Sequence, residues 1–481
     1  MATVTLRTTA GRGVLAAAVL GSGVAFLDAT VVNVALPAIG EDLDAGLSAL
    51  QWVLDGYLLT LGALLLLGGS LGDLFGRRLM FLAGLAAFSV ASALCGLAPS
   101  AGYLVAARVL QGAGGALLVP GSLAILSASF RAEDRSEAVG AWSGLAGVTT
   151  ALGPFAGGWL VDAVSWRLVF LVNLPLAALA AVIALRYVPE SRDPAGGGRP
   201  DWAGAVLATV GLGGVVFALI ERSGAAVAPA AVGGVAALAA FPLVERRRAR
   251  PLVPPSLFRS RQFLGTNLTT LAVYAALGGA LFLVALDLQT VLGYSALEAG
   301  AAMLPITLIL LALSARAGRL ARRTGPRPPL TVGPVVAGAG LLLLSGLDPG
   351  DRYLTAILPG VAVLGLGMAA TVAPLTSAVL AAVDEQHVGA ASGFNNAVAR
   401  VGGLLAVAVL PVLAGVETGP GFHDGVVTAL RITAGLAAAG GLSSLLLVGR
   451  AAVPLRSVPL PDVSHACHDP CLRERSPSPA G

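Results

Sequence analysis

The chain has no lysine, only three cysteines, and charged side chains at just 12% of its 481 positions. Without lysine it cannot contain the G-x-x-x-x-G-K-[ST] loop that cradles phosphates, which excludes an ATPase motor of that type. Three cysteines do not make a disulfide framework. Soluble domains are typically about 25% charged, whereas 56% of this chain is hydrophobic. The composition therefore indicates an integral membrane protein with many spans.

Long apolar runs recur along the whole chain. A helix of about 20 residues crosses the hydrocarbon core, and lipid leaves only helices and closed barrels as spanning structures. Barrel strands would alternate apolar and polar residues, but these runs are solid apolar blocks, so we predict an all-α polytopic membrane protein. The fourteen predicted spans are 13–36, 50–70, 79–98, 103–127, 138–161, 167–186, 202–221, 225–244, 265–288, 298–315, 329–346, 353–378, 395–416 and 429–449.

The arginines sort by side of the membrane. Cytoplasmic loops collect basic residues, and with the N-terminus inside, most of the 30 basic residues fall in inside segments. The exceptions are Arg108, within a span, and Arg167, Arg222, Arg352 and Arg431 on the outside. Arg400 is counted as inside, with a position within the span 395–416 as the alternative. We therefore predict that both termini are cytoplasmic and that the basic side meets the anionic lipid of the inner leaflet. The net charge of +4 then requires no nucleic-acid partner.

Residues 202–244 decide the architecture, because Glu221 and Arg222 are their only charges and arginine-rich loops flank them. Two helices with a turn at Glu221 return the chain to the same side, which one helix cannot do. Six spans then stand before this pair and six after it, and Gly69–Arg78 recurs in degenerate form at Gly318–Arg327. Repeats of this kind are how many secondary transporters are built. The predicted segments are a cytoplasmic N-terminus 1–12, an N-terminal half 13–188, a linker 189–262 with the two extra helices, a C-terminal half 263–450 and a disordered tail 451–481.

Three acids lie in or near predicted spans: Asp28, Asp55 and Asp287. A carboxylate at mid-span costs roughly 2.5–3.5 kcal/mol, so it needs a partner or a function. Asp28 is the deepest, and an acid that takes up and releases a proton in lipid is what a proton-driven transporter requires. For Asp55 and Asp287 a solvated helix end is an equally good interpretation.

Arg108 is a permanent cation at span depth, so we expect it to face a polar space and to meet a carboxylate or carbonyl groups. Gln111 lies nearly on the same helix face. Either Arg108 tunes the proton site, or it is an anchor that reaches the outer interface. Further polar side chains in the spans are candidates for substrate binding, with helix–helix hydrogen bonding as the alternative for each. These candidates are Asn33, Tyr57, Gln111 and Gln289.

Two glycine-rich elements complete the candidate machinery. The first joins the second and third spans and contains Gly69, Gly72, Asp73, Gly76, Arg77 and Arg78. We expect Asp73 near the start of the third helix, where the helix dipole favours negative charge, with the arginines bonded to it as a latch between the halves. A plain basic loop is the alternative. The second element, in the fifth span, contains Gly153, Pro154, Gly157 and Gly158. Glycines allow close helix approach and the proline bends the helix.

These motifs resemble those of the major facilitator superfamily, in particular its fourteen-helix drug/proton antiporter branch. The loop Gly69–Arg78, the first-helix run Leu27–Pro37, Arg108–Gly112 in the fourth helix, the element ending at Gly158 and the run Trp166–Pro175 carry the resemblance, in order and in the expected helices. It implies two six-helix halves that rock around a central site, with two extra helices between them. It also implies the Gly69–Arg78 loop as a gate and the Gly153–Gly158 element as a seal and hinge. The family motif favours Asp28 for proton coupling, and Arg108 and Asp287 are the further proton-coupling candidates. In this branch an acid in the second half can also recognise cationic drugs, and Asp287 is the nearest candidate.

The resemblance implies a proton-coupled antiporter that exports amphiphilic, cationic or antibiotic-like small molecules from the cell, in a bacterial inner membrane, as a monomer without metal or cofactor. A proton-linked or facilitative importer of a nutrient is the first alternative. A membrane receptor or enzyme is the second, and we expect the histidines to lie outside the spans that it would need. They are His387, His423, His465 and His468. Of these, His465 and His468, with Cys467 and Cys471, resemble a metal cluster in the tail, although chance in a disordered tail explains them better.

Overall fold

The computed structural model describes residues 4–192, 200–248, 253–384, 387–416, 419 and 421–449. Every named element in these ranges is helical. Fourteen helices there are long and apolar enough to cross a membrane, which confirms the predicted number of spans for the described chain. The tail with His465, Cys467, His468 and Cys471 lies outside the described residues.

The first half comprises α1 Thr9–Asp42, α2 Leu47–Phe75, α3 Arg77–Gly96, α4 Ala101–Ser129, α5 Ala132–Ala163, the single turn α6 Leu168–Leu171 and α7 Asn173–Tyr187. The insertion comprises α8 Trp202–Glu221 and α9 Val227–Glu245. The second half comprises the 3-10 turn η2 Pro255–Arg259, α10 Arg261–Thr290, α11 Ala296–Thr324, α12 Arg327–Leu344, the π turn η3 Tyr353–Ile357, α13 Leu358–Leu380, α14 Val388–Leu413 and α15 Phe422–Leu447.

Most helices extend beyond the predicted apolar runs, because polar residues cap their ends outside the apolar stretch. The side chain of Thr8 accepts a hydrogen bond from Gly11 N at the start of α1. Ser295 and Glu298 form a reciprocal capping box at the start of α11. Such caps satisfy backbone N–H groups that have no partner within the helix. Hydropathy alone therefore locates the spans but underestimates the length of the helices.

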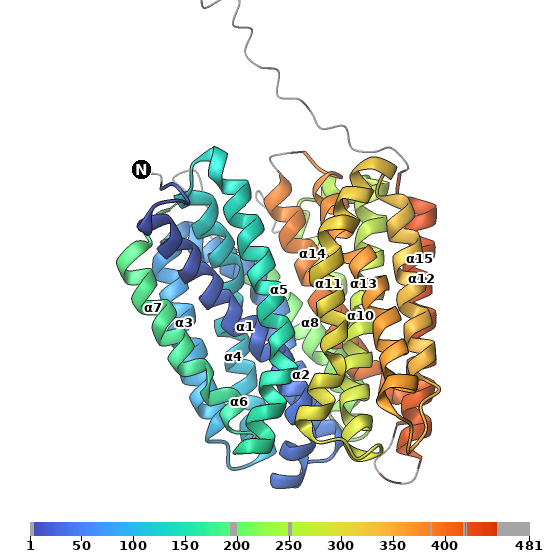
Figure 1. The fold of residues 1–481 in the computed structure, drawn as a ribbon. Helices are drawn as coiled ribbons and strands as arrows, with labels where there is room; N and C mark the ends of the chain where they lie inside the picture. The colour runs from blue at the N-terminus through green and yellow to red at the C-terminus, as the bar shows by residue number, and fades with distance from the viewer. Residues whose placement is uncertain are drawn as a thin grey trace, which may run out of the picture.

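The two halves stand side by side, each a bundle of long helices (Figure 1). The insertion helix α8 packs against both of them, since Val216 shares an apolar cluster with Leu59 of α2 and Leu404 of α14. Trp52 Nε1 donates to the Glu221 carboxylate over 2.9 Å at the end of α8. Glu221 and Arg222 therefore form the turn predicted between the two extra helices, and α8 covers the side of the molecule where α2 meets α14.

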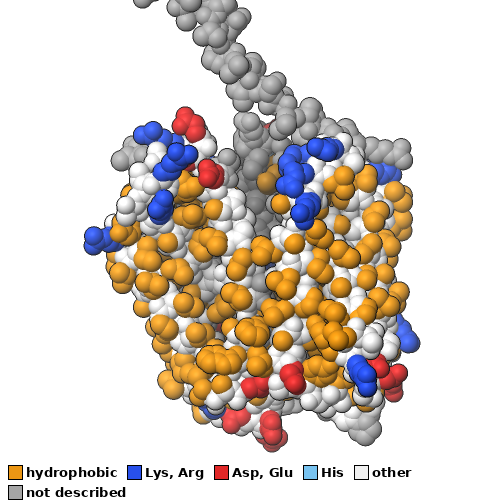
Figure 2. Space-filling view, in the orientation of Figure 1, with side chains coloured by type: hydrophobic (Ala, Val, Ile, Leu, Met, Phe, Trp, Pro, Cys, Tyr) orange, Lys and Arg blue, Asp and Glu red, His pale blue; other side chains and the backbone are white. Residues whose placement is uncertain are grey.

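The distribution of apolar and basic side chains on the surface fits a protein that spans a membrane. Apolar side chains cover the flank of the bundle in Figure 2, while arginines gather at the end of the molecule that carries the N-terminus. Large apolar residues such as Val90, Val182 and Leu446 are more than 60% exposed. In a polytopic membrane protein such residues face lipid, where exposure of apolar surface has no cost.

The halves are held together at the end opposite the N-terminus. Gln51 Nε2 of α2 donates to Val407 O of α14 over 2.6 Å, and Gln289 Nε2 of α10 donates to Val34 O of α1 over 3.1 Å. The Asp162 carboxylate at the end of α5 accepts from two backbone N–H groups of α11. Within the described ranges, every direct hydrogen bond between the halves lies at this end.

Helices α5 and α11 meet at that end and separate toward the other (Figure 1). Gly158 lies against the backbone of Ala296, and Gly300 against the backbone of Pro154. At the N-terminal end of α5 the situation is reversed, because a Cβ added at Gly140 or Gly144 would have no neighbour within 4 Å. The structure is therefore closed at one end of the half–half interface and open between α5 and α11 at the other.

Candidate proton-coupling and transport site

Asp28 lies in the middle of α1 and is completely buried. Its carboxylate is surrounded by N–H donors from two other helices. Arg108 Nη1 of α4 donates to Oδ2 over 2.5 Å. Gln111 Nε2 and Asn173 Nδ2 donate to Oδ1 over 2.8 and 3.0 Å. Because every partner is a donor, the geometry fits the ionised carboxylate, which can only accept.

Arg108 is equally enclosed, with 1% of its surface exposed. Besides Asp28, its guanidinium group donates to Val53 O over 2.9 Å and to Gln111 Oε1 over 2.7 Å. It also lies over the ring of Tyr57, 4.2 Å from the centroid, a favourable cation–π contact. Arg108 therefore meets both a carboxylate and a carbonyl group within the first half, and its side chain does not reach the membrane–water interface.

Two side chains of α3 hold the amide groups that bind Asp28. Ser92 Oγ of α3 accepts from Gln111 Nε2 over 2.7 Å and from Asn173 Nδ2 over 3.1 Å. Cys95, also buried, contacts Gln111 Oε1 at 3.6 Å. Asn173 and Ser92 were not among the predicted site residues. Asn173 had a signal, since it is a polar residue two positions before Pro175 in an apolar run, and it begins α7 directly after the single turn α6.

No hydrogen bond among the described residues joins the other predicted binding residues to one another. The Tyr57 hydroxyl donates to Ala25 O over 2.9 Å, and the Asn33 amide donates to carbonyls of its own helix. Gln289 joins the two halves through Val34 O. In this conformation each is engaged in hydrogen bonds to helix backbone.

The remaining acids are both more buried than a solvated helix end. Asp55 is fully enclosed in α2, and neither carboxyl oxygen has a hydrogen-bond partner among the described residues. Asp287 is 4% exposed at the end of α10, and both its oxygens contact His423 Nδ1, at 2.9 and 3.1 Å. His423 Nε2 lies 2.8 Å from Leu347 O, so that nitrogen carries a proton, and the contact of Nδ1 with Asp287 requires a second proton on one of these two groups. The expectation that His423 lies outside the spans is wrong, because it is in the first turn of α15, one of the helices long and apolar enough to cross a membrane.

The Gly69–Arg78 loop is a tight break between two helices. Asp73 is in the last turn of α2 and α3 begins at Arg77, so the expectation that Asp73 starts the third helix is wrong. The chain turns at Gly76, whose φ is +122°, a conformation natural only to glycine. Arg77 Nη2 pairs with Asp73 Oδ1 at 2.8 Å.

Glu190 occupies the position predicted for Asp73, since its carboxylate accepts from the N–H groups of Arg78 and Leu79 at the start of α3. Among the described residues, the hydrogen-bond partners of this loop lie in the first half and at Glu190 and Ser191, where the linker begins. The degenerate copy in the second half turns in the same way, because Gly325 has a φ of +85°.

The glycine element of α5 packs at the closed end. Gly153 and Gly157 lie against α1, at Thr30 and Val31, and Gly158 lies against α11. Pro154 is inside the helix and its carbonyl touches Gly300 of α11. This element therefore sits where three helices from both halves converge.

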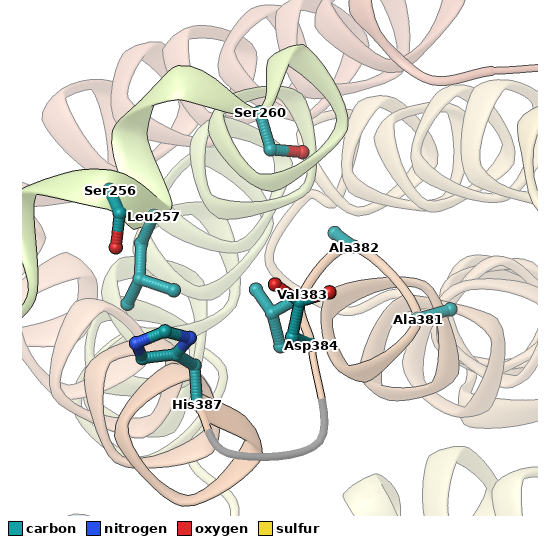
Figure 3. Close-up of a pocket in the computed structure, with 8 residues that line it drawn as sticks. All are labelled: Ser256, Leu257, Ser260, Ala381, Ala382, Val383, Asp384 and His387. Carbon is teal, nitrogen blue, oxygen red and sulfur yellow. The ribbon is translucent and has the colours of Figure 1, made fainter.

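A separate pocket of about 250 Å³ lies at the end of the second half that carries the start of α10 (Figure 3). Ser256, Leu257 and Ser260 line one side, and Asp384 and His387 the other. None of the predicted site residues lines it. Its small size and its position between a 3-10 turn and the α13–α14 connection argue against a transport site.

Solved structures of transporters share this architecture. A peptide transporter in complex with sulfate aligns with a TM-score of 0.68 at 15% sequence identity, over 92% of this chain and 96% of that one. A bacterial homolog of the human lysosomal transporter Spinster, inward-facing and unoccupied, aligns with a TM-score of 0.64 at 17% identity, over 92% and 97%. The fold is thus that of polytopic membrane transporters with two helical halves.

Residues 18–407 match the model of the Major Facilitator Superfamily, and the chain belongs to that family. Curated relatives are similar along most of their length. The chain is 37% identical to the tetracenomycin C resistance and export protein of Streptomyces glaucescens, over 85% of this chain and 77% of that protein. It is 38% identical to the puromycin resistance protein of Streptomyces alboniger, over 80% and 78%. It is 35% identical to a methylenomycin A resistance protein of Streptomyces coelicolor, over 89% and 91%.

Proposed function

We propose that the protein is a proton-coupled antiporter that exports amphiphilic, antibiotic-like molecules across the cell membrane by alternating access. Export is supported by the relatives, whose names describe antibiotic resistance and export. Proton coupling is supported by one observation above all. Asp28 is an enclosed carboxylate at mid-helix, matched by Arg108 and two amides.

The observed conformation fits one step of such a cycle. Asp28 has only donors around it, and the half–half interface is closed at the end opposite the N-terminus. With the arginine-rich end at the cytoplasm, this is the cytoplasm-facing state after the proton has left. Protonation of Asp28 in the outward-facing state would remove the charge that holds Arg108, and loss of the proton to the cytoplasm would restore the pair.

The rest of the proposal follows from this scheme. Both termini are cytoplasmic and the basic end contacts the anionic inner leaflet. The protein acts as a monomer, not as an enzyme, and uses the proton gradient in place of a cofactor. The Gly69–Arg78 loop and the glycine element of α5 serve as cytoplasmic gate and outer seal. Asp287, paired with His423, is a second titratable pair in the half that lacks Asp28.

Transport into everted vesicles tests the proposal. In these vesicles an exporter accumulates a fluorescent amphiphile when the interior is acidic, and an importer does not. Ethidium, a cation, and 1-pyrenebutyrate, an acid, are tested in parallel, so that the sign of the substrate charge does not decide the result. We expect accumulation with wild-type protein and, for Asp28→Asn, the level seen without a gradient. The matched control is Asp44→Asn, an exposed acid in a left-handed position that asparagine tolerates. Unchanged gradient-driven accumulation in Asp28→Asn would remove Asp28 from the coupling mechanism.

A further inference from the structure

Arg400 lies near the middle of α14 and faces the first half of the molecule. Its Cβ is 3.3 Å from the position that a Cβ at Gly62 of α2 would take. Its guanidinium carbon is 5.8 Å from the centroid of the Phe26 ring in α1. Arg400 is half-buried. The side chain therefore brings a permanent positive charge to the interface between the halves at mid-membrane depth.

No side chain in the described part of the chain neutralises this charge. Arg108 at similar depth has a carboxylate and two oxygen acceptors. Arg400 makes no hydrogen bond or ion pair with any described residue; its guanidinium group lies near the Phe26 ring and its Cβ packs on α2 at Gly62. A charged side chain within a span is costly and normally faces a partner or a polar space that has a use. Arg108 is paired and Arg400 is not, and we look for the reason in the function of Arg400.

None of the three acids Asp28, Asp55 and Asp287 pairs with Arg400. Asp28 is fully engaged by Arg108, Gln111 and Asn173. Asp287 is held by His423 at the outer end of the second half. Asp55 is on the helix that Arg400 contacts, but it is fully enclosed and its oxygens reach no partner there.

Aromatic surface lies beside Arg400 on the opposite half. The rings of Phe26 and Trp142 are 6.4 Å apart and tilted by 54°. Trp142 is fixed by its hydrogen bond to Ser22 Oγ, 2.7 Å long. A rigid aromatic pair accepts a flat apolar body by stacking, and a guanidinium group binds a carboxylate through two parallel hydrogen bonds.

We propose that Arg400, with Phe26 and Trp142, recognises an acidic group on the transported molecule, so that the preferred substrates are amphiphilic acids with an aromatic body. This inference rests on the proposed export function and names its substrate class. It differs from the cationic compounds that the family resemblance favours. The acid contacts a charge from the second half while its body contacts rings from the first, so a bound substrate bridges the two halves.

Binding of a matched pair of probes tests the charge preference. Full-length protein in nanodiscs is dialysed against 1-pyrenebutyrate or its neutral methyl ester, with empty nanodiscs to subtract partition into lipid. We expect the carboxylate to bind about tenfold more tightly than the ester, the factor that a hydrogen bond to a charged group supplies. In Arg400→Gln the two probes should bind within about twofold of each other.

Two further variants separate recognition from folding. Arg431→Gln removes an exposed arginine from α15, which packs on α10 and α12 rather than at the half–half interface, and it should keep the full preference. Arg400→Lys keeps the charge without the planar fork and should retain part of it. The proposal fails if the wild type does not prefer the acid, or if Arg400→Gln weakens both probes equally.

This binding experiment needs no proton gradient, so its result is independent of the export proposal. Selective acid binding without gradient-driven transport would reject the antiport scheme and keep the role of Arg400. Proton-driven transport without acid selectivity would reject the role of Arg400 and keep the antiport scheme.

Discussion

Breaking the Asp28–Arg108 pair from one side should cost far more stability than replacing both partners. In Asp28→Asn, Arg108 stays enclosed with only neutral acceptors, Val53 O and Gln111 Oε1, around it. The new amide also directs N–H groups toward the donors of Gln111 and Asn173. Removing one member of a buried ion pair typically costs about 3–5 kcal/mol, because it leaves an uncompensated charge.

Substitution of Arg108 instead of Asp28 should destabilise the protein less. In Arg108→Gln, Asp28 keeps two amide donors and can become neutral by binding a proton, so the loss is that of hydrogen bonds to a charged group, about 1.5–3 kcal/mol. In the double variant Asp28→Asn/Arg108→Gln no charge remains in the enclosed site. Replacing both members of a buried pair by hydrophobic residues of similar volume is often close to neutral, and with two amides the site likewise holds no uncompensated charge. The double variant should therefore be more stable than Asp28→Asn alone.

Thermal unfolding of purified protein in one detergent, followed by tryptophan fluorescence, measures this order. We expect wild type and Asp44→Asn to unfold at the same temperature, with the double variant below them and Asp28→Asn lowest. The interaction free energy from the cycle should be at least about 2 kcal/mol. Additive losses, or an Asp28→Asn protein as stable as wild type, would refute the view that this pair is buried and electrostatically matched.

Two more predictions concern the closed end. Asp162 accepts from the N–H groups of Ala296 and Leu297, which the capping box of α11 leaves without a partner. Asp162→Asn should therefore increase the outward-open fraction, measured by spin-label distances between the ends of α5 and α11 that meet here. An unchanged distance distribution would exclude a latch at Asp162. Gly158→Val should hinder closure and lower transport at least tenfold, because a side chain there meets the backbone of Ala296. Gly144→Val should keep its transport activity, because Gly144 has open space around it in the observed state. Equal transport by the two variants would show that close packing at Gly158 is dispensable.

The sequence was sufficient for the spans, the insertion and the depth of Asp28, because apolar length and mid-span charge are local signals. It also required a polar partner for Arg108, since an unpaired cation in lipid is costly. It could not name Asn173, Ser92 or Asp162 as partners, because their contacts depend on which helix faces meet. The helix break was misplaced at Asp73 because hydropathy ends the span at the first polar residues, whereas the helix continues until Gly76 forces a turn.

Helix α1 is the physical connection between the Asp28 cluster and the glycine element of α5, which we propose as the proton site and the outer seal. It carries Asp28 on one face, while Thr30 and Val31 lie against Gly153 and Gly157 of α5. One turn further, Val34 O accepts the bond from Gln289 of the second half. The cluster around Asp28 has no hydrogen bond to the second half among the described residues, so a change in its charge reaches the interface most directly by moving α1. We therefore expect Asp28→Asn to lengthen a spin-label distance between the outer ends of α1 and α10; an unaltered distance would show that charge at Asp28 and closure of the outer seal are not coupled through this helix.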